Sequence, residues 1–144
     1  MGVQSKNILG VKPEIQKQAT IFNETFKEAE ELKAYIFLAK RSFEIGDLTS
    51  ASNYLAEEFR TSIPLFHDCA ILFEKIALKY VETKQIDEAL EHIRYAISSW
   101  TEETKRLDLQ NQDIQHCQKK IEYLSKLYGE IEKTNQQKSK IKED

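Results

Sequence analysis

The strongest constraint on the fold of this chain is a helix-pair pattern that occurs twice, 38 residues apart. In each copy two alanines stand 12 residues apart, Ala39 and Ala51 in the first and Ala77 and Ala89 in the second. Alanines at such positions allow two helix axes to approach to about 8 Å, because no bulky side chain lies between them. A repeat of this length is typical of an array of helix pairs, an architecture that usually binds other proteins.

Apolar residues surround each alanine pair at steps of three and four, which keep them on one face of a helix. The positions that share this spacing are Tyr35, Leu38, Leu55, Phe73, Ile76, Tyr80, Ile93 and Ala96. The chain has only four Gly and two Pro, so few residues favour turns or break elements. We therefore predict an all-α fold of antiparallel helix-pair repeats, flanked by long N- and C-terminal helices.

Turn and capping residues predict the helix boundaries of the first copy. Residues 14–45 form either one long helix or two helices with a break near 23–24. Gly46 supplies the left-handed residue that ends this stretch, and Asp47 can cap the next helix.

Two further boundaries are predicted in the second copy. The Thr-Ser-Ile-Pro stretch at 61–64 places a capping hydroxyl ahead of an N-terminal proline, which is a signal for a new helix. Leu65 then begins the apolar face of that helix. Residues 83–85 form the turn to its partner.

The C-terminal stretch has a seven-residue periodicity instead. Its apolar residues form two adjacent rows, which we call the seam: Leu107, Ile114, Ile121 and Tyr128, with Cys117, Leu124 and Ile131. Rows of this kind pack along one side of another helix. The seam therefore either covers the helix pairs or pairs with a second copy of the chain.

Composition predicts the domain organisation. We expect a flexible arm over 1–12, a single helical domain over 13–133, and a disordered tail or fraying helix end over 134–144, since the tail has little apolar surface to bury. The net charge of −3 does not indicate a nucleic-acid partner, and no apolar run reaches the roughly 20 residues of a membrane span. Without a secretory signal, Cys69 and Cys117 are expected to be the reduced thiols of a cytoplasmic protein.

On these residues the chain resembles the tetratricopeptide-repeat (TPR) family, whose repeats of about 34 residues are antiparallel helix pairs with small residues at the crossing. The resemblance covers roughly residues 32–100, and Ser42 and Glu58 depart from the family pattern. Residues 121–128 resemble the first helix of a third repeat, which suggests a fragment of a longer array. Residues 86–100 with 121–131 also resemble a microtubule-interacting-and-transport three-helix domain.

The TPR resemblance implies a binding site, because the first helix of each pair lines the concave groove in that family. The positions that map to this groove are Lys33, Ile36, Lys40, Phe43, Ile71, Glu74, Lys75 and Leu78. Lysines among apolar side chains suit an amphipathic or acidic peptide, although lysines also serve simply to solvate helix faces. The carboxylate clamp of chaperone-binding family members is not expected, since positions 36 and 71 are both isoleucine.

We therefore predict a non-catalytic adaptor or scaffold that uses no cofactor and no metal. One alternative is a structural subunit that self-associates through the 107–131 seam. A metal-binding or enzymatic bundle is disfavoured, because His116 and Cys117 are adjacent on a helix and point about 100° apart. Asp113 and His116 have the spacing of a di-iron motif but lack its second copy. We expect solvent-facing histidines and half-buried cysteines.

Overall fold

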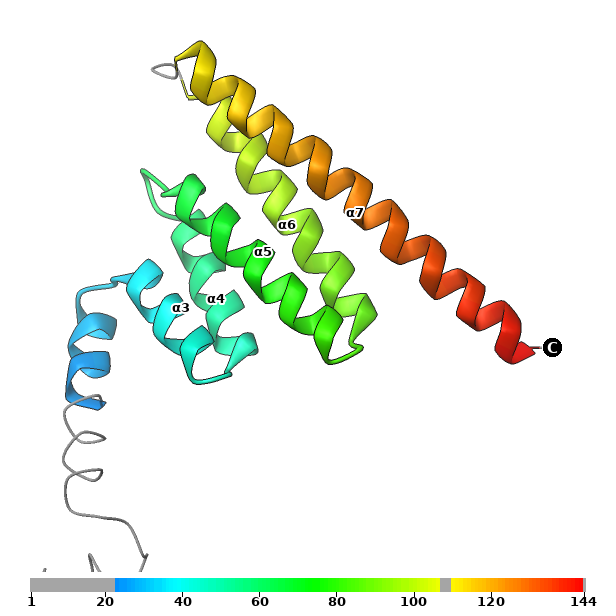
Figure 1. The fold of residues 1–144 in the computed structure, drawn as a ribbon. Coiled ribbons are helices and arrows are strands. Elements are labelled where there is room, and N and C mark those ends of the chain that lie inside the picture. The colour runs from blue at the N-terminus through cyan, green and yellow to red at the C-terminus, as the bar shows by residue number, and fades with distance from the viewer. Residues whose placement is uncertain (1–22, 107–109, 144) are drawn as a thin grey trace, which may run out of the picture.

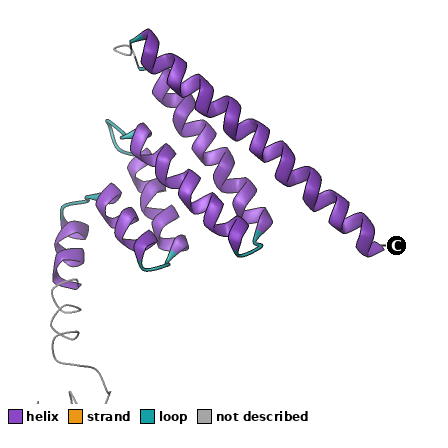
Figure 2. Ribbon diagram, viewed as in Figure 1, coloured by secondary structure: helices purple, strands orange, loops and turns teal. Residues whose placement is uncertain are grey.

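The structure, a computed structural model, describes residues 23–106 and 110–143, with side chains through Lys138. Throughout this part of the chain the regular structure is helical (Figure 2), which confirms the predicted all-α fold. Residues 23–31 are helical, and the following helices are α3 (Tyr35–Glu44), α4 (Leu48–Phe59), α5 (Phe66–Glu82), α6 (Ile86–Thr104) and α7 (Asn111–Glu143). The predicted arm over 1–12 lies outside the described residues.

The helices pack in chain order. α3 lies against α4, α5 against α6, and α6 against α7, while α3 also contacts α5 (Figure 1). The four alanines of the repeated pattern are completely buried, as close helix packing requires. One hydrophobic core runs through all these helices, and Leu55, Ile76, Ile93, Trp100 and Leu124 are among its fully buried members.

Three helices end in the same hydrogen-bonded turn. The residues at its left-handed position are Lys33, Gly46 and Lys84, with φ of 56°, 85° and 62°. In each turn the backbone N–H of the left-handed residue donates to the carbonyl three residues earlier. The backbone N–H of the next residue donates to the carbonyl five residues before it. This is the Schellman motif, which satisfies carbonyls that the helix end leaves free.

The first of these turns corrects one prediction. The break in the 14–45 stretch lies at 32–34, whereas Asn23 and Glu24 are helical. The sequence does not predict this break, because its left-handed residue is Lys33, whereas glycine is the usual signal for a left-handed residue at a helix end. The prediction for Gly46 and Asp47 is confirmed, because the Asp47 carboxylate accepts the backbone N–H of Ser50 at 3.0 Å.

The start of α5 differs from the prediction. Its first residue is Phe66, and the N-cap Leu65 has no side-chain cap and is exposed. The Thr61 hydroxyl instead donates to the backbone carbonyl of Glu58 at 2.8 Å, at the end of α4. The buried Glu58 carboxylate accepts the Leu65 N–H at 3.1 Å. A side chain of the preceding helix therefore satisfies one of the N–H groups that the start of α5 leaves free, and no capping hydroxyl is used.

The seam of α7 packs within the molecule. Cys117 and Leu124 are buried, and Ile121, Tyr128 and Ile131 are partly buried against the core, whereas Leu107 lies outside the described residues. Over 134–143, where the sequence predicts either disorder or a fraying helix end, α7 continues as helix to Glu143. Extending a docked helix costs less than nucleating one, and the Lys, Gln and Glu residues of this segment favour helix.

Candidate functional site

The two cysteines are buried more deeply than expected. Cys69 is completely buried, and burial, together with the nearby charges of Glu58 and Asp68, raises the pKa of its thiol to about 12. Burial also raises the pKa of the Cys117 thiol. A thiolate is the form that attacks electrophiles or binds metals, so Cys69 remains an unreactive thiol at neutral pH.

The histidines take part in packing. His92, expected at the surface, is buried: its Nδ1 donates to the Glu88 carbonyl at 2.7 Å and its Nε2 accepts from the Ser52 hydroxyl at 2.9 Å. His67 and His116 pack edge-on against the Trp100 ring, at centroid distances of 5.2 and 5.6 Å. Among the described residues, no group of three or more His, Cys, Asp or Glu side chains could hold a metal ion.

The structure separates the eight predicted groove residues into two sets. On α3, Ile36 and Phe43 are half-buried and pack against the core, whereas Lys40 is exposed. Lys33 is also exposed and lies in the turn before α3. Because α3 contacts α5, the two sets lie on neighbouring helices, and the apolar residues of the α3 set are partly buried against the core.

The set on α5 remains largely available to solvent. We call Ile71, Glu74, Lys75 and Leu78 the α5 strip, because their spacing places them on one side of that helix. Ile71 and Leu78 are 38% and 39% exposed. Glu74 is half-buried, with its carboxylate 3.8 Å from the Lys120 ammonium of α7. This ion pair shows that the α5 strip borders α7.

Between α5 and α7 lies a hollow of about 300 Å³. Its lining residues, which define the middle hollow, are Glu74, His116, Lys119, Lys120 and Tyr123. Tyr123 is 50% exposed, and the Lys120 ammonium lies 5.9 Å from the centre of its ring. The middle hollow therefore combines an accessible aromatic surface with two lysines.

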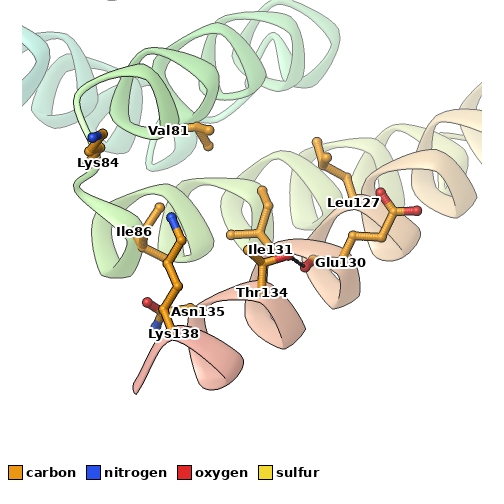
Figure 3. A pocket seen from close by; sticks show the side chains of 9 residues that line it. All are labelled: Val81, Lys84, Ile86, Leu127, Glu130, Ile131, Thr134, Asn135 and Lys138. Atoms are coloured by element: carbon orange, nitrogen blue, oxygen red, sulfur yellow. Dashed lines mark hydrogen bonds between the residues drawn. The ribbon is translucent and has the colours of Figure 1, made fainter. Parts of the chain in front are cut away.

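A larger groove of about 790 Å³ lies farther along the same two helices, where the α5–α6 turn faces α7 (Figure 3). We call it the end groove, and its lining residues are Val81, Lys84, Ile86, Leu127, Glu130, Ile131, Thr134, Asn135 and Lys138. Val81, Ile86, Leu127 and Ile131 form its aliphatic part, and all four are partly buried.

The two hollows lie in line because α5 and α7 run in the same direction (Figure 1). From the middle hollow to the end groove, the lining residue on α5 advances from Glu74 to Val81 and that on α7 from Tyr123 to Leu127. The lining contains four lysines and two glutamates, on a chain of net charge −3. This side of the molecule is therefore more cationic than the chain as a whole.

Apart from Ile131, which belongs to the seam, the α7 residues that line these hollows were not predicted from the sequence. Lys120, Leu127 and Thr134 are spaced by seven, as are His116, Tyr123 and Glu130, and both rows flank the seam. That spacing was a usable signal. The seam packs against α6, and this packing places the flanking rows beside α5. The spacing alone does not specify that arrangement.

A third cleft, of about 520 Å³, is formed by α4, α5 and α6. Phe59, Phe73 and Tyr95 line it together with polar residues that include Ser52 and Arg60. The Tyr95 hydroxyl donates to the Glu91 carboxylate, which raises the pKa of Tyr95. Arg60, the basic residue that lines this cleft, is paired with Glu57 at 2.9 Å. Unlike the end groove, the cleft therefore has no unpaired lysine or arginine among its lining residues.

Comparisons of the chain with protein-family models, with curated proteins and with solved structures give no significant match. Within residues 23–106 and 110–143, none of the helices combines the length and the apolar character needed to cross a bilayer.

Proposed function

We propose that this protein is a non-catalytic interaction module, an adaptor or scaffold, that binds an amphipathic, net-acidic segment of another protein along α5. The observation that carries this proposal is the α5 strip. Two aliphatic side chains seven residues apart, Ile71 and Leu78, are more than one-third exposed on either side of Lys75. An accessible aliphatic row with interspersed positive charge suits the apolar face of an acidic helix.

The strip is large enough to matter energetically. Burying a whole Leu or Ile side chain stabilises a complex by about 1.5–3 kcal/mol, so covering the exposed two-fifths of Ile71 and Leu78 contributes about 1 kcal/mol each. The lysines nearby contribute mainly to the association rate and to partner choice.

We further propose that the chain is a TPR-like helical repeat protein of the cytoplasm. The supporting features are the buried alanines and the two Schellman turns at Gly46 and Lys84, which are 38 residues apart like the alanines. Cys69 and Cys117 are free thiols, the form that cysteines keep in a reducing compartment.

Self-association through the seam is the less favoured function. Cys117 and Leu124 are buried, and the neighbouring seam residues pack against the core of the same chain. A second copy could use them only if α7 left α6.

The proposal is tested with a displayed library of random 16-residue peptides selected on the purified protein. Enriched peptides are expected to be net-acidic, with aliphatic residues three or four apart. Fluorescence anisotropy should show at least tenfold weaker binding to Ile71→Ala/Leu78→Ala, because about 2 kcal/mol of contact is removed.

The matched control is Ile45→Ala/Ile63→Ala, which truncates two exposed isoleucines outside the strip. It should bind the peptides as the unaltered protein does. Equal affinity of both double variants, or the absence of enriched acidic peptides, would overturn the proposed function.

A further inference from the structure

We infer that the acidic partner segment, bound as a helix, continues from the α5 strip into the end groove, where further aliphatic side chains lie between the α5–α6 turn and α7. Its carboxylates face Lys84 and Lys138. This inference rests on the proposed function, and it specifies where the partner is held, in which direction it lies and which residue pattern it carries.

The end groove exists because α7 is much longer than its neighbour. α7 has 33 residues and α6 has 19, which correspond to about 50 Å and about 28 Å of helix. α7 therefore continues past the α5–α6 turn with no further helix of the described chain beside it (Figure 1). Its extension forms one wall of the groove and the turn forms the other.

The aliphatic part of the groove is built by three helices. Val81 comes from α5, Ile86 from α6, and Leu127 and Ile131 from successive turns of α7 (Figure 3). All are partly accessible, so an incoming side chain can remove more of their surface from water. Side chains four residues apart on a partner helix match the spacing of the two α7 residues.

The charges give the groove a direction. Lys84 and Lys138 lie at the end near the turn, and Glu130 lies beside Leu127 toward the other end (Figure 3). Within the described chain neither lysine forms an ion pair, whereas Lys79, nearby on α5, is 3.3 Å from the Glu82 carboxylate. Two free ammonium groups at one end favour carboxylates there.

The spacing on α7 predicts the partner pattern. Glu130 and Lys138 are eight residues apart, about 12 Å along the helix axis. A partner helix lying alongside should carry acidic residues near one end, two aliphatic residues four apart in the middle, and a basic residue about eight positions from the acidic ones. The affinity comes from the aliphatic contacts and the direction from the charges.

The test uses a fluorescein-labelled 18-residue alanine-based helical peptide with this pattern: two Glu, two Leu four residues apart, and one Arg. It should bind the full chain and lose at least tenfold in affinity for Lys84→Glu/Lys138→Glu. A peptide with the acidic and basic residues exchanged should instead prefer that variant.

The matched control is Lys126→Glu/Lys133→Glu, which makes the same change in charge. Both of its lysines are exposed, and helical spacing places them on the side of α7 opposite the end groove. Its affinity for the peptide should stay within a few-fold of the unaltered protein. Equal losses in the two charge-reversed variants, with circular dichroism unchanged, would show general attraction only and overturn the docking site.

The remaining outcomes separate this inference from the proposed function. Binding that is lost in Ile71→Ala/Leu78→Ala but kept in Lys84→Glu/Lys138→Glu would retain the module and reject the end groove. No binding of any acidic peptide would reject both. A dimer in sedimentation analysis that Lys84→Glu/Lys138→Glu dissociates would make a second copy the occupant and overturn the inference.

Discussion

Replacing Glu58 by alanine should destabilise the junction between α4 and α5. Its carboxylate is buried and accepts the Leu65 N–H at 3.1 Å, just before α5 begins. A hydrogen bond to a charged group contributes about 1.5–3 kcal/mol, but Leu65 is 46% exposed and water can partly replace the carboxylate. The Thr61 hydroxyl also lies 3.3 Å from the Glu58 carboxylate, but this contact adds little because the hydroxyl donates to the Glu58 backbone carbonyl at 2.8 Å.

Helix dipoles do not change this value much. Glu58 lies in the last turn of α4, where a negative charge is unfavourable, and near the start of α5, where it is favourable. The two effects oppose each other, so we expect Glu58→Ala to lower the free energy of unfolding by about 1–2 kcal/mol. For a chain of 144 residues that corresponds to a decrease in Tm of about 3–7 °C.

Urea denaturation followed by circular dichroism at 222 nm measures this change. The matched control is Glu57→Ala, which removes an exposed carboxylate that pairs with Arg60 and should cost no more than about 0.5 kcal/mol. Glu58→Gln keeps an oxygen acceptor and should lie between the two. Equal stability of Glu58→Ala and Glu57→Ala would refute the role of the Glu58 carboxylate at the start of α5.

Three other changes test separate parts of the fold. Ala77→Leu or Ala89→Leu should overpack the interior and cost about 1–3 kcal/mol in thermal melts, and unchanged Tm in both would show that these alanines are not at a helix crossing. The pKa of Cys69 is raised from its ordinary value of 9.0 to about 12, so the stability linked to its thiol should be constant below pH 9 and fall as the pH rises from 9 toward 12. A Cys69→Ser variant should lack this part of the decline in the free energy of unfolding. Deletion of 134–144 should change the free energy of unfolding by less than about 1 kcal/mol in urea titrations. It should nevertheless weaken peptide binding several-fold, because Thr134, Asn135 and Lys138 line the end groove, and a deleted chain that binds the peptide as tightly as the full chain would place the site elsewhere.

Much of the fold was predictable because it depends on local interactions. The helical faces around Leu38, Ile76 and Ile93 follow from three- and four-residue spacing, and these side chains are completely buried. The turn at Gly46-Asp47 was also predictable, since a left-handed glycine and a capping carboxylate act within a few residues. The break at Lys33 was not, because lysine gives no such local signal.

The candidate site was only half predictable. The α5 strip follows from helix periodicity and the family resemblance, and Ile71 and Leu78 are indeed exposed. The predicted α3 residues Ile36 and Phe43 are instead partly taken up by the core. Most of the α7 wall, with the exception of Ile131, was not predicted, because its residues matter only through their distance from α5, which sequence spacing does not contain.

The sequence by itself thus determined the all-α class, the apolar faces and the glycine turn, since each depends on residues within about one helical turn of one another. The tertiary structure decided which residues face a groove and which remain in contact with the core. Glu58 reaches seven residues to the start of α5, and Lys138 lies in the same groove as Lys84 although 54 residues separate them. Such pairings arise from how helices pack against one another, and packing depends on the shapes of all the surfaces brought together.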